Sequence, residues 1–250
     1  MKNELESSYY VSLAIKCTYH SKLKKVGAIV GTDIYGALKV EAQPLGFFET
    51  PIAYAQLKES EKLLYDLERS IHKHKASNAG LSRSNVRSWH SDTNMMEWGG
   101  EAANKLANTA ISIAKRMSHF QESSPDAFEW KVSMWANVTS LNGLNHIHAH
   151  PGNLWAAVLY INMGRGPSSK EDVGGTLYVE DPRFPMAAMH NAGFRMKDVN
   201  GKQQAYQVDL NLREGNLVVF PAWLRHGVRP YRGTGERISV AMNIDAAPNH

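Results

Sequence analysis

The sequence has almost no cysteine: Cys17 is the only one in 250 residues. A single thiol cannot form a disulfide within the chain, which excludes the small secreted domains that disulfides hold together. The first ten residues include two acidic side chains and no long apolar core, so they do not resemble a signal peptide. We therefore expect a protein of the reducing cytoplasm.

The sequence also lacks long hydrophobic runs and dense basic patches. No stretch approaches the roughly 18 uninterrupted apolar residues of a membrane-spanning helix, so we expect no membrane contact. The formal net charge is +4, but the Lys and Arg residues are scattered, with only short clusters such as Lys22, Lys24 and Lys25. Nucleic-acid binding needs a denser basic surface, so we expect no nucleic-acid partner. The oligomeric state stays open.

The N-terminal half combines short apolar runs with two helical patterns. Residues 8–55 contain apolar runs separated by turns, which favour short β segments. Apolar residues then recur at helical spacing over 57–71 and again over 103–117. The polar, Ser- and Asn-rich stretch between them, about 76–98, is expected to be a loop.

From about residue 131 the pattern changes to short strands. Residues 132–139 alternate strictly, so that apolar and mixed side chains fall on opposite faces. Further apolar segments, separated by Gly- and Pro-bearing turns, follow at 154–162, 175–181, 216–220 and 237–244. Several short strands with turns between them indicate a sandwich or barrel. We predict one α+β domain over 1–250, with β segments and supporting helices in 1–130 and a double-sheet core in 131–245.

Three histidines lie at spacing two in the segment NHIHAHPG: His146, His148 and His150. On a strand this spacing places the side chains on one face. Imidazole is the commonest neutral metal ligand and suits iron, zinc, copper and nickel. We expect a metal site here, with a solvated His-rich loop as the alternative.

The C-terminal segment joins another histidine to a candidate anion site. His226 follows the apolar strand 217–220, and Arg237 opens the alternating strand 237–244, where it shares a face with Ser239. If the opposite, apolar face packs in the core, Arg237 and Ser239 face a cavity. A buried guanidinium needs an anionic partner, and its planar fork matches a carboxylate. The alternative is an exposed surface arginine.

These motifs resemble the jelly-roll 2-oxoglutarate/Fe(II) oxygenase superfamily, in which a distal histidine is followed by an Arg, often with a nearby Ser. Within it, the chain resembles a group of bacterial and phage oxygenases with an H-x-H-P-[GN] motif. The matching segments are His148–Gly152, Leu159-Tyr160, Asp181-Pro182-Arg183, Phe220–Val228 and, more weakly, Phe47–Ile52 and Ser84–Asp92. The resemblance implies a double-stranded β-helix (jelly-roll, cupin-like) core buttressed by N-terminal helices.

The resemblance also implies roles for individual residues. His226 and His148 would bind Fe(II), while Arg237 and Ser239 would hold the distal carboxylate of 2-oxoglutarate. Tyr160 and Asn137 are further candidates for contacts to this cosubstrate.

The third iron ligand departs from the usual pattern of the superfamily. Most members have His-x-Asp or His-x-Glu, but no acid lies between Leu141 and Asn162. The position of the acid is occupied by His150. Either three histidines bind the metal, or Asp181 supplies the third ligand. Related halogenases also lack the acid, but they carry a small residue there rather than a second histidine.

The implied activity is that of a non-haem iron dioxygenase using 2-oxoglutarate on an unactivated C–H bond of a small molecule. Hydroxylation is the expected outcome, with desaturation or ring closure as variants, in amino-acid or natural-product tailoring. Trp89 and His90 are candidates for a substrate lid, and Arg183 for pairing with a substrate carboxylate. A cupin-like metal-binding protein or isomerase that does not oxidise is the alternative. It would explain the histidines but not the pair Arg237 and Ser239.

Overall fold

The structure is a computed structural model that describes residues 45–121, 124–164, 173–183 and 195–249. The chain divides into two units, Met1–Phe47 and Phe48–His250. Of the first unit only residues 45–47 are described, so the predicted β segments between 8 and 44 lie outside the described residues, as does Cys17. The prediction of one domain over 1–250 therefore stays a prediction. Among the described residues, no helix combines the length and hydrophobicity that a membrane crossing demands.

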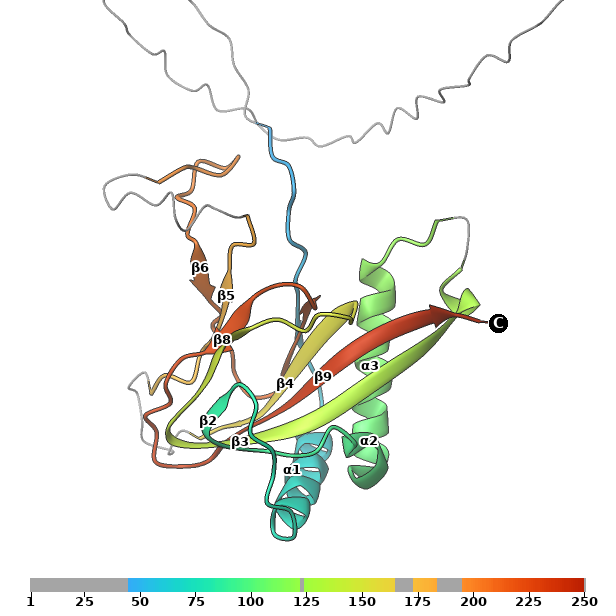
Figure 1. The fold of residues 1–250 in the computed structure, drawn as a ribbon, viewed down its shortest axis with the longest axis vertical. Helices are drawn as coiled ribbons and strands as arrows, with labels where there is room; N and C mark the ends of the chain where they lie inside the picture. Colours follow the sequence, from blue (N-terminus) through green and yellow to red (C-terminus); the bar gives the residue numbers. More distant parts are fainter. Residues whose placement is uncertain (1–44, 122–123, 165–172, 184–194, 250) are drawn as a thin grey trace, which may run out of the picture. The chain divides into compact units, whose positions relative to one another are not determined.

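The second unit is built on antiparallel strands. They are β1 (Ala53–Gln56), β2 (Asn85–His90), β3 (Phe128–His148), β4 (Trp155–Met163), β5 (Leu177–Glu180), β6 (Gln207–Asp209), β7 (Asn216–Pro221), β8 (His226–Val228) and β9 (Arg237–Pro248). Their order in the sheet is β1-β7-β4-β9-β3-β8-β5-β6, and β2 also pairs with β3. Neighbouring strands in this order are mostly far apart in sequence, so the sheet depends on long-range pairing (Figure 1).

Strand β3 makes the sheet curl. Its first part, from Phe128 to Thr139, pairs with β9, whereas Asn145 and His148 pair with β8. One 21-residue strand therefore belongs to both halves of the sheet. Because of this bend, β8, β5 and β6 form a second, smaller wall, and the interior lies between that wall and the strands β3, β9, β4 and β7.

The larger half of the sheet packs its outer face against two helices, α1 (Glu61–Lys75) and α3 (Gly100–Met117) (Figure 1). Both helices are amphipathic, as the apolar spacing predicts. The buried stripe of α3 is rich in alanine, which lets the helix approach the sheet closely. The sheet contributes Met134, Ala136 and Val138 from β3 and the even-numbered residues 238–244 from β9. The apolar face of the alternation predicted in both strands is therefore the helix-facing one.

The prediction of a loop over 76–98 is wrong in part, because this stretch contains β2 and the short helix α2 (Met95–Trp98). Strand β2 is polar and pairs with the edge of β3 across a bulge between Val86 and Ser88. Backbone hydrogen bonds to an available edge create this strand, and they leave no hydrophobic pattern in the sequence. A 3₁₀ turn, η1 (Pro125–Ala127), precedes β3.

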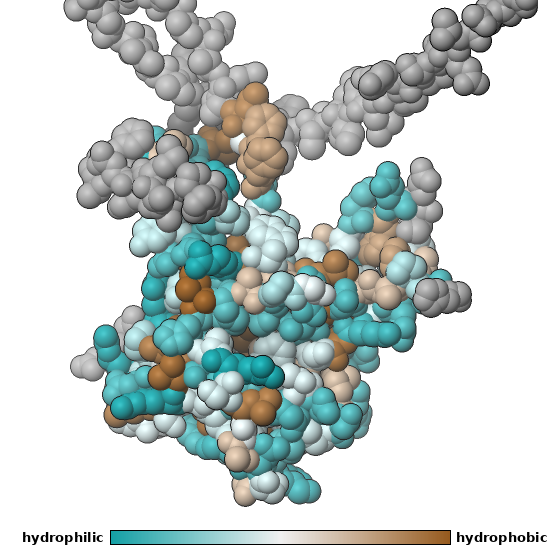
Figure 2. All heavy atoms as spheres, in the orientation of Figure 1, coloured by the Kyte–Doolittle hydropathy of each residue, from teal (hydrophilic) through white to brown (hydrophobic). Residues whose placement is uncertain are grey.

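The first helix begins at Glu61 rather than near residue 57. The backbone N–H of Leu57 donates instead to the carbonyl of Gly215, which ties the segment after β1 to the turn before β7. On the face shown in Figure 2, hydrophilic side chains predominate over the described part and hydrophobic ones are scattered among them.

Candidate active site

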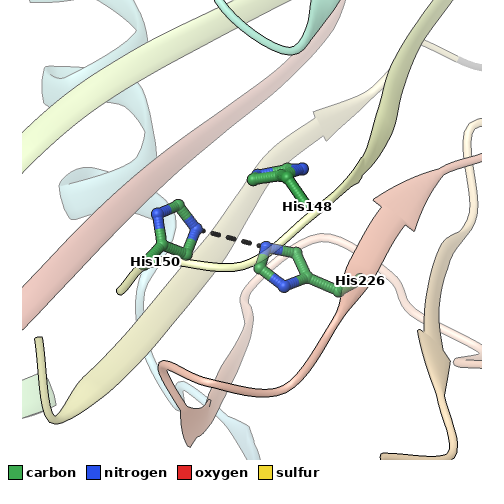
Figure 3. A group of neighbouring side chains, drawn as sticks. All are labelled: His148, His150 and His226. Carbon is green, nitrogen blue, oxygen red and sulfur yellow. Dashed lines mark hydrogen bonds between the residues drawn. The ribbon is translucent and has the colours of Figure 1, made fainter. Parts of the chain in front are cut away.

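Three histidine rings converge inside the curled sheet (Figure 3). His148 ends β3 and His226 begins β8, and the two are cross-strand partners. His150 lies two residues beyond β3, where its backbone N–H donates to the carbonyl of Ala222 at 2.9 Å. One ring nitrogen from each of the three histidines lies within 4.8 Å of the others. Antiparallel pairing thus joins two segments that are far apart in the sequence.

Hydrogen bonds to backbone carbonyls orient two of the rings. The Nδ1 of His148 lies 2.7 Å from the carbonyl oxygen of His146, and that of His226 lies 2.8 Å from the carbonyl oxygen of Leu224. A carbonyl oxygen only accepts, so both Nδ1 atoms donate. A neutral ring that donates from Nδ1 has its lone pair on Nε2, the atom available to a metal. The Nε2 atoms of His226 and His150 are 3.3 Å apart.

Burial keeps these rings neutral. It lowers the pKa of His148, and together with the neighbouring His148 it lowers the pKa of His150 to about 4 and that of His226 to about 3. Neutral imidazole is the form that binds metals, so at pH 7 no proton has to be displaced from these rings. The three rings are therefore prepared as nitrogen ligands.

The other two candidates for the metal site lie differently. His146 is exposed and takes part through its backbone carbonyl. Asp181 binds Arg183, and this hydrogen bond holds the pKa of the Asp181 carboxyl below its usual value. Within the described part of the chain, Asp181 belongs neither to the histidine group nor to the wall of the adjoining cavity.

A cavity of about 430 Å³ adjoins the histidines. Asn137 on β3, Ser239 on β9 and Tyr160 on β4 are cross-strand partners in one row, and all three line this cavity. The sequence-predicted cosubstrate residues thus come together as neighbours on three adjacent strands. Burial raises the pKa of the Tyr160 hydroxyl, which the charge of Arg237 only partly offsets, so Tyr160 is a neutral hydroxyl group.

Arg237 lies beneath this row and is only 1% exposed. Its guanidinium carbon lies 4.8 Å from the centre of the Tyr160 ring. Its Nε and Nη2 atoms have no hydrogen-bond partner among the residues that the structure describes. Gly175 leaves the space for this side chain, since an added Cβ there would lie 2.8 Å from Cδ of Arg237. A buried cation with two unused donors is a site for an anion.

The remaining sequence candidates lie in three places: His90 at the cavity, Trp89 against the main hydrophobic core and Arg183 at the surface. His90 is buried, lines the cavity and stacks on Trp135 at a centroid distance of 5.5 Å. Trp89 points away: its indole N–H donates to the carbonyl of Asn78. Successive strand residues face opposite sides, so only one of this pair reaches the site. Arg183 pairs with Asp181, as noted above, and also contacts Gln204.

Several cavity residues were not predicted as site residues from the sequence. Arg83, Ser84 and Thr93 come from the segments that flank β2, and Asn145 comes from the bend of β3. Asn243 continues the face of Arg237 and Ser239, so the strand alternation alone could have indicated it. Arg83, Ser84 and Thr93 reach the site because β2 pairs with β3, and Asn145 because β3 bends toward β8. No local hydrophobic pattern predicts either arrangement.

Comparison with known proteins agrees with this geometry. Residues 133–243 match a family model described as "Putative 2OG-Fe(II) oxygenase". This range contains the three histidines together with Asn137, Tyr160, Arg237 and Ser239. No curated protein matches the chain at a significant level.

Solved structures share the fold at low sequence identity. A prolyl-4-hydroxylase from Pseudomonas putida is 14% identical, covering 78% of this chain and 92% of that one, with a TM-score of 0.50. A prolyl hydroxylase from Trichoplax adhaerens, in complex with a peptide fragment of hypoxia inducible factor, is 13% identical, with coverages of 78% and 83% and a TM-score of 0.53. HygX from Streptomyces hygroscopicus, with nickel and 2-oxoglutarate bound, is 10% identical, with the same coverages and a TM-score of 0.52.

These findings confirm the predicted double-stranded β-helix fold. The family match over residues 133–243 agrees with this fold, which the solved oxygenase structures share. Fe(II) and 2-oxoglutarate, the predicted cofactors, appear in the description of the matched family model.

Proposed function

We propose that the protein oxidises an unactivated C–H bond of a small molecule, with hydroxylation as the outcome. In this proposal His148, His150 and His226 hold Fe(II), and Arg237 and Ser239 hold the distal carboxylate of 2-oxoglutarate, with Tyr160 and Asn137 beside it. The observation that supports this assignment best is the buried guanidinium of Arg237 with two unused donors.

Arg237 is costly to bury without a counter-charge. An unpaired charge in the interior destabilises the fold, so the free protein carries this cost for the sake of a ligand. A carboxylate accepts two parallel hydrogen bonds from the guanidinium fork, and the hydroxyl of Ser239 donates from the same strand face. The site is thus suited to one end of a dicarboxylate whose other end reaches the histidines.

The histidine group fits a divalent metal. It offers three neutral nitrogen donors, and backbone hydrogen bonds fix the orientation of the His148 and His226 rings. With no acid among the ligands, the metal would keep its full charge of two, which the metal-side carboxylate of the cosubstrate balances in part. When bound, iron supplies the redox chemistry that couples O2 reduction to oxidation of the substrate. The overall balance is substrate–H + 2-oxoglutarate + O2 → substrate–OH + succinate + CO2.

The protein residues position these partners and exclude water. The apolar part of the cavity wall includes Phe220, Val158 and Ala241. The buried Tyr160 closes the side next to Arg237. A cavity of about 430 Å³ lies within the usual range for small-molecule sites, which favours a small substrate over a protein surface.

A direct experiment tests the proposal. Protein loaded with Fe(II) is mixed with 2-oxoglutarate without air, the visible charge-transfer band is recorded, and succinate is measured after O2 is admitted. We expect the band and slow succinate formation from the wild-type protein. Arg237→Gln should lose most of the band at the same 2-oxoglutarate concentration while retaining iron.

Arg225→Gln is the matched control, because Arg225 is a surface arginine paired with Glu180. It should behave as wild type. Iron binding without band or succinate in the wild-type protein would instead support the non-oxidative, cupin-like alternative.

A further inference from the structure

The wall of the cavity has charge of one sign only. Among its described lining residues there is no Asp or Glu, whereas Arg83 adds a positive charge near the four histidines His90, His148, His150 and His226. Arg237 places a second positive charge beneath the same wall. The metal of the proposed site would add two more. A cavity with this balance attracts anions and disfavours cations.

Arg83 is anchored beside the cavity by a hydrogen bond of its backbone, and not by an ion pair of its side chain with a described residue. Its N–H donates to Oδ1 of Asn85 at 2.7 Å, at the start of β2. Its guanidinium makes no hydrogen bond or ion pair with any described residue. Its charge nevertheless reaches the site, since it lowers the pKa of His90 in addition to the larger effect of burial. The exposed Arg83 therefore lines the cavity without a charge partner among the described residues.

Ser84, the residue after Arg83, and Asn145 also line the cavity. The side-chain amide of Asn145 donates to Oγ of Ser84 at 3.2 Å, which leaves the Ser84 hydroxyl hydrogen for another acceptor. The carbonyl of Ser84 accepts from the backbone N–H of His146, which fixes the segment beside the β3 edge. Arg83 and Ser84 thus both line the cavity, where they add a guanidinium and a hydroxyl donor to its wall.

The cosubstrate leaves this second pair unused. Under the proposed function, one carboxylate of 2-oxoglutarate belongs to Arg237 and the other lies at the metal. We propose that Arg83, with the Ser84 hydroxyl, binds a carboxylate of the substrate, so that the substrate is a small anionic molecule. This inference rests on the proposed function. Because the described wall has no acid, a free ammonium group on the substrate would have no counter-charge, and we expect its amine to be absent or acylated.

The inference is tested with N-acetyl-L-amino acids, which carry a carboxylate and no ammonium, and with their carboxamides as uncharged matches. Each is titrated by calorimetry into the protein loaded with Ni(II) and 2-oxoglutarate. We expect at least one N-acetyl amino acid to bind at least ~10-fold more tightly than its carboxamide, as for a charge-assisted pair. Arg83→Gln should remove that preference, and Arg83→Glu should reverse it.

Arg87→Gln provides the control, because Arg87 is an exposed arginine on the adjoining strand β2 that does not line the cavity. It should bind as the wild type does. The inference is overturned if no carboxylate is preferred over its carboxamide, or if Arg83→Gln keeps the preference. Weaker 2-oxoglutarate binding in Arg83→Gln would also overturn it, by assigning Arg83 to the cosubstrate. If the wild-type protein shows no charge-transfer band with Fe(II) and 2-oxoglutarate, the proposed function is rejected instead.

Discussion

The two faces of strand β9 have different roles: one packs in the hydrophobic core and the other faces the cavity. Their residues alternate along one backbone. Ile238, Val240, Met242 and Ile244 pack toward the helices and belong to the main hydrophobic core. Ser239, Ala241 and Asn243 line the cavity, and Arg237 lies buried beneath them. One face gains stability from apolar burial, while the other leaves polar atoms without partners. Stability and ligand binding can therefore be changed separately by substituting neighbouring residues.

The largest effect is expected at the metal centre, on the cavity side. His226→Ala removes one of three nitrogen donors, and we expect iron affinity to fall by more than ~100-fold. This exceeds the loss typical of mutating residues that only hydrogen-bond to a metal ligand. Metal content after dialysis and competition with a chelator measure this. His146→Ala is the matched control, since its exposed ring lies outside the group. Equal iron binding by both variants would contradict the assignment.

The core face should respond in stability. Ile244→Ala removes a fully buried side chain, and we expect the free energy of unfolding to fall by about 2–5 kcal/mol. Asn243→Ala, the next residue on the opposite face, removes an unsatisfied buried oxygen and should change it by less than ~1 kcal/mol. Denaturant unfolding compares the two. A larger loss in Asn243→Ala would break the division between the faces.

Arg237 should show the reverse separation. Arg237→Met removes a buried charge but keeps much of the volume, so we expect unchanged or higher stability without ligand. Its affinity for 2-oxoglutarate should fall about 10- to 100-fold, because the variant cannot make the hydrogen bonds between guanidinium and carboxylate. Unfolding curves with and without 2-oxoglutarate measure both effects. If Arg237→Met strongly destabilised the protein without 2-oxoglutarate, Arg237 would contribute to folding stability rather than to ligand binding.

The smallest effect is expected at Gly175. This residue has φ +69° and faces the Arg237 side chain, so Gly175→Ala strains the backbone and displaces Cδ and Nε of Arg237. We expect 2-oxoglutarate affinity to fall about 3- to 10-fold, with a stability loss of about 1 kcal/mol. Gly201→Ala is a control, because it has a similar φ and open space around its Cβ. If both variants bind 2-oxoglutarate equally, the space for Arg237 is not critical.

The strand alternation in the sequence was informative because it depends only on neighbouring residues. The 3.6-residue and two-residue periods predicted both helices and the apolar faces of β3 and β9, and the resemblance identified the fold that the comparisons confirm. The spacing of His148, His150, His226, Arg237 and Ser239 also indicated a metal site and an anion site, although their roles stay proposals.

The sequence by itself determined which side of each core strand is apolar, since side-chain direction follows the backbone repeat. Only the tertiary structure decided what faces the polar side. The pairing of β3 with β8 brings His226 to His148, and the pairing of β2 with β3 brings Arg83 and His90 to the cavity. Such pairings are made by backbone groups that every residue shares, so they leave no mark in the local sequence.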